Sequence, residues 1–362
     1  MQSMSGRGAT PGDAAGALEA FTEQIKRARE TAGALNIVGG GTKSFYGRPG
    51  VGEPLATGHF HGIVEYEPAE LVVTVLAGTR LDALATALAN ERQMLAFEPP
   101  SFGAASTVGG VVAAGLSGPR RPYAGAVRDS VLGVEMMTAD AEVLRFGGQV
   151  MKNVAGYDVS RVMAGSLGTL GLLLTLSLKV LPLPEYERTL VWQRRAGEAR
   201  RLMLDIARKP WPVSAMAYAA RTLRVRLSGS ADGVEEAAAA LAADGSEDGS
   251  FWGELNGQRL DFFDDPAPLW RLSVPPAAER IDLPGAWLCD WGGALRWLKS
   301  TAPASVVRAH AQAAGGHASL FRGHDELPFT PLDKVNSTIH RRLKAAFDPH
   351  RIFNPGRLYA DL

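Results

Sequence analysis

The stretch "PPSFGAASTVGGVVAAGLSGP", residues 99–119, combines features that an ordinary helix or strand does not combine. It has no charged side chain, yet it contains five glycines, three prolines and four hydroxyl side chains. A membrane-spanning helix needs about 20 predominantly apolar residues with unbroken helical hydrogen bonding. Because Pro99 and Pro100 open the stretch and polar residues interrupt it, we exclude a membrane span. We expect bare backbone that lies close to a ligand.

The other apolar segments also argue against membrane insertion. The run 162–178 contains Gly165, Gly168 and Gly171, which is typical of a glycine turn followed by a buried strand. The N-terminal residues 1–17 have no continuous apolar stretch after their basic residue, so we expect no secretory signal. We therefore predict a cytoplasmic protein without an integral membrane segment.

Composition narrows the class of protein. With 362 residues, 46% hydrophobic and 21% charged, the chain is typical of a soluble globular protein of two domains. Lys plus Arg and Asp plus Glu number 38 each, so no charge excess favours nucleic acid or an anionic membrane. The single cysteine, Cys289, excludes an internal disulfide and any four-cysteine iron-sulfur or zinc site. An iron-sulfur cluster would have to lie on a partner.

The first half of the chain alternates short apolar segments with glycine turns. We expect a flexible N-terminus at 1–16 and an α+β domain at 17–182, which ends where two prolines fall within "LPLPE". A helix is expected within 78–92, capped by Thr79. The expected strands are 35–38, 63–66, 71–76, 94–97, 131–138, 142–146 and 169–180.

The second half predicts a smaller domain at 186–330. Its expected strands and helices follow the order of a split βαβ arrangement, which indicates a ferredoxin-like α+β cap: strand 190–193, helix 198–208, strands 213–219 and 223–228, helix 233–243. Residues 331–362 predict an amphipathic helix and a turn-rich tail.

Three glycine-rich blocks carry the functional signal. They are "IVGGGTKSFYG" at 37–47, the stretch at 99–119, and "NVAGYDVSRVMAGSLGTLG" at 153–171. Backbone without Cβ atoms can approach a ligand closely, and successive N–H groups in turns bind anions. A phosphate-bearing ligand is therefore expected.

Two common phosphate motifs do not match these blocks. A Walker A loop needs Gly-Lys adjacent, but Thr42 separates Gly41 from Lys43, and a Rossmann fingerprint would need glycine where Ser44 stands. The third block precedes a strand, which is the reverse of the Rossmann order. Any one block is equally well explained as a simple turn. Three in one region favour an extended dinucleotide with an apolar ring system.

The order of the motifs resembles a known superfamily. GGGTK, PP(x)₆TVGG(x)₄G, KNVAGYD(x)₆GSLGTLG and FDP(x)₃FNPG follow one another as in the FAD-binding domain of the vanillyl-alcohol oxidase and p-cresol methylhydroxylase (PCMH) type. Within it, the chain is most similar to the FAD-binding E subunits of bacterial glycolate oxidase. The resemblance implies a PCMH-type FAD-binding domain of two subdomains. It also implies a complex that oxidises glycolate to glyoxylate, with a catalytic FAD-containing chain and an iron-sulfur subunit as partners.

The resemblance also implies cofactor-binding positions. The pyrophosphate would be held by Gly39, Gly40, Gly41, Thr42 and Lys43. The flavin and its ribityl chain would be lined by Ser101, Thr107, Gly109, Gly110, Ser117 and Gly118, with Asp129 just beyond. Further contacts would come from Lys152, Asn153, Gly165, Gly168, Thr169, Gly171, Asn354 and Gly356. Lys152 and Asn153 could alternatively anchor a loop. Relatives that bind FAD covalently often carry a histidine at the first glycine turn. Since Thr42 and Lys43 stand there, noncovalent FAD is expected.

The catalytic residues are less clearly marked. Oxidation of a 2-hydroxy acid needs a base, a cation for the carboxylate and a hydride acceptor. The D-type relatives carry G-H-x-G-D-G-N-x-H, but here "GGHASLFRGHDE" retains His317, Arg322, His324 and Asp325 without metal-ligand spacing, so no metal is expected. His317 would act as base and Arg322 would bind the carboxylate. A structural explanation, in which both end a strand, is preferred.

Three functions stay open. The first is an FAD-binding subunit of glycolate oxidase, and the second is a self-sufficient FAD-dependent 2-hydroxy-acid dehydrogenase of the D-lactate type that uses His317 and Arg322. The third is an assembly scaffold with a vestigial FAD site. Intact glycine blocks favour the first two, and the missing histidine motif favours the first. Partner docking is expected at the second domain's outer surface and at the tryptophan-rich segment 287–297.

Overall fold

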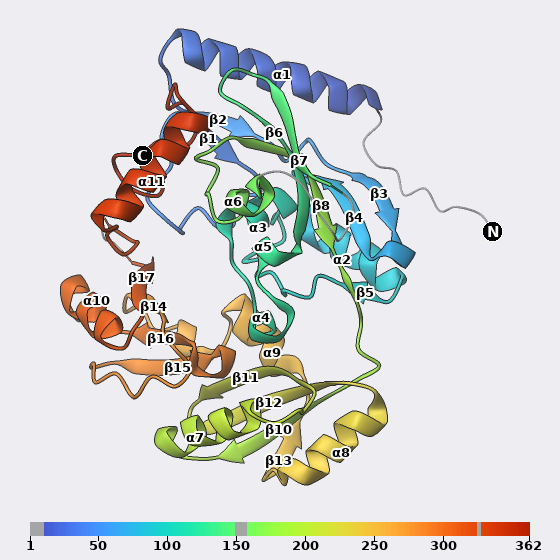
Figure 1. The fold of residues 1–362 in the computed structure, drawn as a ribbon, viewed down its shortest axis with the longest axis vertical. Helices are drawn as coiled ribbons and strands as arrows, with labels where there is room; N and C mark the ends of the chain where they lie inside the picture. Colours follow the sequence, from blue (N-terminus) through green and yellow to red (C-terminus); the bar gives the residue numbers. More distant parts are fainter. Residues whose placement is uncertain (1–10, 149–157, 324–326) are drawn as a thin grey trace.

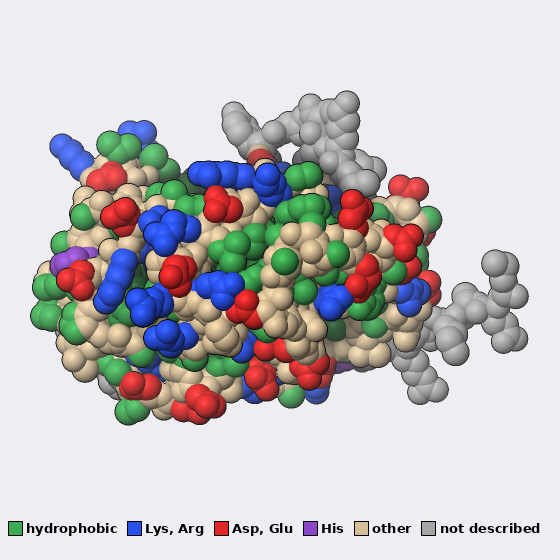
Figure 2. All heavy atoms as spheres, turned by 90° about the horizontal axis from the view of Figure 1, so that it is seen from below, with side chains coloured by type: hydrophobic (Ala, Val, Ile, Leu, Met, Phe, Trp, Pro, Cys, Tyr) green, Lys and Arg blue, Asp and Glu red, His purple; other side chains and the backbone are tan. Residues whose placement is uncertain are grey.

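A computed structural model describes residues 11–148, 158–323 and 327–362 of the chain. Figure 1 shows two regions, an upper one built on a five-stranded sheet and a lower one built on an eight-stranded sheet. Two further two-stranded sheets lie outside them. No helix of the described residues is long and apolar enough to cross a membrane. On the face in Figure 2, acidic and basic side chains are interspersed with apolar ones.

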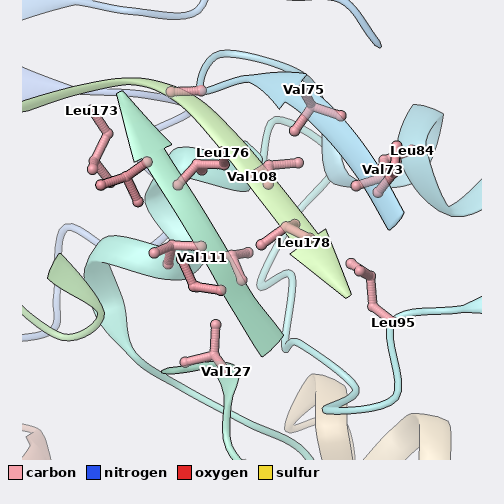
Figure 3. Close-up of a cluster of buried hydrophobic side chains, with 14 of the residues drawn as sticks. Val73, Val75, Leu84, Leu95, Val108, Val111, Val127, Leu173, Leu176 and Leu178 are labelled. Carbon is pink, nitrogen blue, oxygen red and sulfur yellow. The ribbon is translucent and has the colours of Figure 1, made fainter. Parts of the chain in front are cut away.

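The five-stranded sheet is antiparallel throughout. Its strands follow the spatial order β3 (Ile63–Glu67), β4 (Val72–Leu76), β8 (Leu172–Lys179), β6 (Val131–Met137) and β7 (Val143–Gly147). Helices α2 (Leu81–Asn90) and α3 (Val108–Ala114) supply apolar side chains to its core, which Figure 3 shows. Val73, Leu84 and Leu178 are fully buried there. The third glycine block therefore leads into the central strand β8, as the sequence predicts.

A smaller layer, formed mainly by N-terminal elements, packs against this sheet. It contains α1 (Pro11–Glu30) and the parallel pair β1 (Leu35–Val38) and β2 (Glu53–Ala56). The C-terminal helix α11 (Lys334–Phe347) lies beside this pair in Figure 1, and Leu35 forms a parallel bridge with Phe353. The two ends of the described chain thus share one core. Short helices complete this region: α4 (Arg121–Ala124), α5 (Val127–Ser130) and α6 (Val159–Met163).

The first half of the eight-stranded sheet has ferredoxin-like connectivity. In chain order it comprises β10 (Tyr186–Gln193), α7 (Ala196–Ala207), β11 (Val213–Ala219), β12 (Thr222–Gly229), α8 (Ala231–Leu241) and β13 (Gly245–Glu247). In space the strands run β13-β10-β12-β11. This βαββαβ order agrees with the ferredoxin-like arrangement expected from the sequence.

The second half repeats the strand pattern in mirror order along the sheet. After α9 (Ser250–Gly257) come β14 (Leu269–Ser273), β15 (Ala286–Asp290), β16 (Leu295–Lys299), α10 (Ala304–Ala313) and β17 (His317–Arg322). The spatial order is β15-β16-β14-β17, and no α-helix lies between β14 and β15. β11 and β15 join the halves through Tyr218 and Cys289. This repeat has no clear signature in the sequence.

The strand expected at 94–97 is wrong in extent. β5 (Gln93–Met94) has two residues and pairs with β9 (Leu181–Pro182). Beyond β5 the chain forms a turn, and Phe97 is fully buried. An apolar run has the same sequence pattern whether it pairs in a sheet or only packs in a core.

The expected helix cap at Thr79 is also wrong. The N-cap residue of α2 is Arg80, whose side chain forms no capping bond. The Thr79 hydroxyl instead donates to the Gly62 carbonyl at 3.0 Å and accepts from the Gly62 N–H at 2.9 Å. A partner distant in sequence has displaced the local capping bond.

The tryptophan-rich segment is not a free docking surface. Trp291 and Trp297 are buried in a core that joins the eight-stranded sheet to Leu116 and Leu167 of the glycine blocks. The half-buried Trp287 donates to the Leu283 carbonyl at 3.3 Å. The expectation of docking there is therefore corrected, because these rings pack inside the chain.

Candidate functional site

The first glycine block lines a cleft of about 340 Å³, which we name the glycine cleft. Residues 39–43 follow β1 directly and form one wall. The other walls include Thr107 and Gly110 from α3 and its N-cap, Leu167 from the third block, and Asn354 from the C-terminal tail. The tertiary structure thus brings all three blocks and the tail to one cleft.

The backbone N–H groups of residues 39–43 lack hydrogen-bond partners in the described part of the chain. Among the described residues, none accepts a hydrogen bond from these five groups. Gly41 has φ of +67°, and a Cβ atom added there would meet no atom within 4 Å. Buried or half-buried N–H groups nearly always have a partner. A row of free N–H groups in a turn is an anion-binding concavity.

Gly40 allows the first and second blocks to pack closely. A Cβ atom on Gly40 would lie 1.4 Å from the Ala105 carbonyl oxygen, and one on Gly39 would lie 2.3 Å from the Thr107 hydroxyl. No side chain fits in the space between these loops. Glycine at 39 and 40 is therefore required by the packing of the cleft wall as well as by access for a ligand.

Lys43 places a cation at the edge of the glycine cleft. Its Nζ donates to the Ser106 hydroxyl at 2.8 Å and to the Ser101 carbonyl at 3.2 Å. Burial lowers the pKa of Lys43 to about 8. The ammonium is still mainly protonated at pH 7, and a bound anion would favour the charged form further.

Hydrogen bonds connect the second and third blocks. Thr107 caps α3, and its hydroxyl accepts from the Gly110 N–H at 3.2 Å. At the other end of α3, the N–H groups of Gly165 and Leu167 donate to the carbonyls of Val112 and Ala113. The third block thus provides the C-terminal cap of this helix.

The C-terminal tail closes one side of the cleft. Asn354 accepts from the Ile37 N–H at 2.7 Å and donates to the Leu167 carbonyl at 2.6 Å. Arg357, which the sequence analysis missed, lines the cleft and donates to the Ser44 carbonyl at 2.9 Å. Its position directly after the FNPG motif was the available signal.

A buried ion pair holds the tail in place. Lys344 donates to Asp348 at 2.7 Å and to the carbonyls of Thr169 and Phe353, both at 2.8 Å. Asp348 accepts from the N–H groups of Ile352 and Phe353. The FDP motif therefore stabilises the turn that carries Asn354.

Several implied cofactor positions lie away from the glycine cleft. Ser117 accepts from the Val127 N–H at 3.0 Å, and Asp129 accepts from the Ala126 N–H at 2.9 Å at the start of α5. Ser101 lines a neighbouring cleft with Arg322, and Gly118 lines a small cavity beside Trp297. Positions that line none of these clefts are Gly109, Gly168, Thr169, Gly171 and Gly356. Lys152 and Asn153 lie outside the described residues.

The glycine cleft fits the diphosphate of a dinucleotide. It provides unpaired N–H groups, a close cradle without side chains, and the Lys43 and Arg357 cations. In contrast, no three His, Cys, Asp or Glu side chains are grouped to hold a metal ion in the described parts of the chain.

Comparison with known proteins agrees with this geometry. Residues 15–147 match the family "FAD binding domain", and residues 321–358 match "FAD linked oxidases, C-terminal domain". Glycolate oxidase subunit GlcE of Escherichia coli K12 is 46% identical over 347 residues, which cover 95% of this chain and 98% of that protein. The chain belongs to the GlcE family. The resemblance stated above is confirmed, as are FAD as the cofactor and the class of FAD-linked oxidoreductases acting on hydroxy acids.

More distant relatives share part of the GlcE-type chain. Glycolate oxidase subunit GlcD of Bacillus subtilis is 37% identical over 135 residues, 37% of this chain and 28% of that protein. A solved structure of alkyldihydroxyacetonephosphate synthase superposes with a TM-score of 0.65 at 16% identity, over 93% of this chain and 74% of that one. This likeness concerns the fold alone and confirms the predicted PCMH-type α+β class.

A second cleft of about 280 Å³ adjoins the glycine cleft in this GlcE-type chain. Ala114 and Leu167 line both. We name it the arginine cleft, after Arg121 and Arg271, which line it with Trp291 and His317. Partial burial, and then the positive charge of Arg271, hold the pKa of His317 below its usual value. The imidazole is therefore mainly neutral at pH 7 and can accept a proton.

The structure does not bring His317 and Arg322 together. They occupy opposite ends of β17, roughly 16 Å apart at the usual rise per residue, and line different clefts. Arg322 donates to the Gln258 amide oxygen at 3.1 and 3.0 Å and stacks over Phe45 at 3.8 Å. The expected pairing on one substrate is corrected, because the two side chains lie five positions apart along an extended strand. Arg271 is the cation beside His317, and sequence reasoning missed it.

Proposed function

We propose that this chain is the FAD-binding subunit of a multi-subunit glycolate oxidase, which oxidises glycolate to glyoxylate. The observation that carries the proposal is the row of unpaired N–H groups at residues 39–43, in a cleft walled by all three glycine blocks. The relationship to GlcE over nearly the whole chain supports the same assignment.

Bound FAD supplies the hydride acceptor for the C–H bond of a 2-hydroxy acid. Residues 39–43 would bind its diphosphate through backbone N–H groups, with Lys43 supplying charge and Thr107, Gly110 and Asn354 shaping the cleft. We propose noncovalent attachment, since no His, Cys or Tyr is among the described residues that line this cleft.

The proposed partners supply an iron-sulfur cluster and a catalytic site to the complex. The family resemblance implies an iron-sulfur chain as the route for electrons, and one cysteine cannot hold a four-cysteine cluster, so that cluster would lie on a partner. A D-type FAD-containing chain provides the main catalytic site. The complex works in the cytoplasm or at the inner membrane through its partners. Within this chain we propose two domains, 17–182 and 186–330, with the tail 331–362 packed back onto the first.

A second candidate function is a self-sufficient 2-hydroxy-acid dehydrogenase. The observation that favours it is a neutral His317 beside Arg271 in a cleft that adjoins the glycine cleft. In that reaction His317 would take the hydroxyl proton while Arg271 binds the carboxylate.

Purification and anaerobic titration test these proposals. We expect a yellow protein whose flavin is released by acid as intact FAD. Flavin that stays with the precipitated polypeptide would contradict noncovalent attachment, and a colourless protein that does not take up added FAD would refute the main proposal. Addition of glycolate should bleach the flavin only when the partner chains are present.

A further inference from the structure

Two arginines from distant parts of the chain stack on one tryptophan. The guanidinium carbon of Arg121 lies 4.4 Å from the ring centroid of Trp291, and that of Arg271 lies 5.1 Å from it. Arg121 begins α4 and Arg271 lies in β14. The indole N–H donates to the Gly118 carbonyl at 2.9 Å, which fixes the ring against the second glycine block. A tryptophan face orients a guanidinium without neutralising it.

Neither guanidinium has an acidic partner. Within the described residues, the guanidinium groups of Arg121 and Arg271 form no ion pair and donate no hydrogen bond. The neighbouring Arg120 instead pairs with Glu98 at 3.3 Å and with Glu187 at 2.5 Å. Arg226 pairs with Glu98 at 2.7 Å. Arg120 and Arg226 are therefore neutralised, whereas Arg121 and Arg271 are not. A third arginine that lines the cleft, Arg128, lies 3.9 Å from Asp129.

The nearest acidic groups neutralise the positive charge of Arg121 and Arg271 only partly. Burial raises the pKa of Asp290 to about 7, so this carboxyl is only about half ionised at neutral pH, and it accepts from the Trp291 N–H at 2.7 Å. Asp129 is bonded to the Ala126 N–H. Burial, followed by the charges of Arg271 and Arg128, lowers the pKa of Arg121. The cleft thus concentrates positive charge that an anion would stabilise.

We propose that the arginine cleft binds the carboxylate of a small 2-hydroxy acid beside the cofactor, with Arg121 and Arg271 as its two cationic ligands. The inference rests on the proposed function for the identity of the anion. The volume of about 280 Å³ admits a two- to four-carbon acid, and the shared wall at Ala114 and Leu167 places it next to the glycine cleft.

Two further groups face this cleft and complete the site. Burial raises the pKa of Tyr46, so its phenol stays protonated and can donate to the ligand. His317, neutral at pH 7, can accept from the substrate hydroxyl. The cleft therefore offers two cations for the carboxylate and a donor and an acceptor for the hydroxyl.

Calorimetric titration of the flavin-loaded full chain tests this inference. Glycolate and the unreactive dianion oxalate should bind, and glycolamide, a neutral analogue of glycolate, should not. Arg121→Gln and Arg271→Gln should each raise the Kd for oxalate about tenfold or more, since each removes a charge-assisted bond. The matched control is Arg224→Gln, because Arg224 also stacks on a ring, Phe251 at 4.2 Å, but is paired with Glu247 at 2.5 Å.

The outcomes separate this inference from the proposed function. A chain that retains FAD but binds neither glycolate nor oxalate overturns the inference and leaves the cofactor assignment intact, whereas failure to retain FAD overturns the proposed function itself. Equal affinity for glycolate and glycolamide would also refute a carboxylate site, and this comparison needs no variant. If the arginine variants lose FAD while oxalate binding is unchanged, the cleft holds cofactor and the inference is wrong.

Discussion

Replacement of Gly40 by alanine should disrupt the glycine cleft. The added Cβ would lie 1.4 Å from the Ala105 carbonyl oxygen, so the two loops would have to separate by roughly 2 Å to reach ordinary contact. The displaced atom belongs to the backbone and cannot rotate away. Overpacking costs about 1–3 kcal/mol, and occasionally more, and we expect the upper end here.

The effect should appear mainly in cofactor affinity, because the loops that separate are the two that form the cleft. About 3 kcal/mol corresponds to roughly a 100-fold rise in the Kd for FAD. FAD fluorescence quenching on titration into the stripped protein measures this Kd. The matched control is Gly58→Ala, because Gly58 lies outside this cleft, and its Cβ would meet no atom within 4 Å and should cost under about 1 kcal/mol. Wild-type affinity in Gly40→Ala, or equal losses in both variants, would refute the reasoning.

Three other predictions follow from the site. The Kd for FAD should rise between pH 7 and pH 9, because Lys43, with a pKa of about 8, loses the charge that favours the diphosphate. The variant Lys43→Met should bind FAD more weakly at pH 7 and show no such rise. A step that persists in the variant would exclude Lys43 as its source. Lys344→Met should lower the free energy of unfolding by about 3–5 kcal/mol in urea, since it leaves the buried Asp348 carboxylate unpaired; a change below about 1 kcal/mol would contradict this role. The isolated chain should show negligible flavin bleaching with glycolate or D-lactate in anaerobic stopped flow, whereas rapid reduction that is lost in His317→Ala would establish the second candidate function.

Local chemistry in the sequence was sufficient for the glycine turns that line the cofactor cleft. Gly39 to Gly41 could be recognised because close backbone approach and a left-handed turn select for glycine at single positions. The strand into which the third block leads was predictable from its apolar run. The left-handed turn at Gly41 and the apolar run of β8 depend on neighbours along the chain, so the printed sequence contains the necessary information for both.

Interactions between distant segments could not be predicted in this way. Thr79 has the residue type of a helix cap but bonds to Gly62, and the run 94–97 resembles a strand but mostly packs in the core. In both cases tertiary contacts outweigh a local preference of about 1 kcal/mol. The same holds for Lys344, which the sequence places on an amphipathic helix and the structure buries.

By itself, then, the sequence determined the glycine turns, the order of the motifs and the absence of a four-cysteine cluster, because each depends on residue type and spacing alone. Only the tertiary structure decided which charged groups meet. His317 and Arg322 are neighbours in sequence, but the extended strand between them keeps them apart. Arg121 and Arg271 are far apart in sequence, but packing of α4 and β14 around Trp291 brings them to one cleft. Side-chain proximity across sheets depends on packing of the whole chain, which no local pattern specifies.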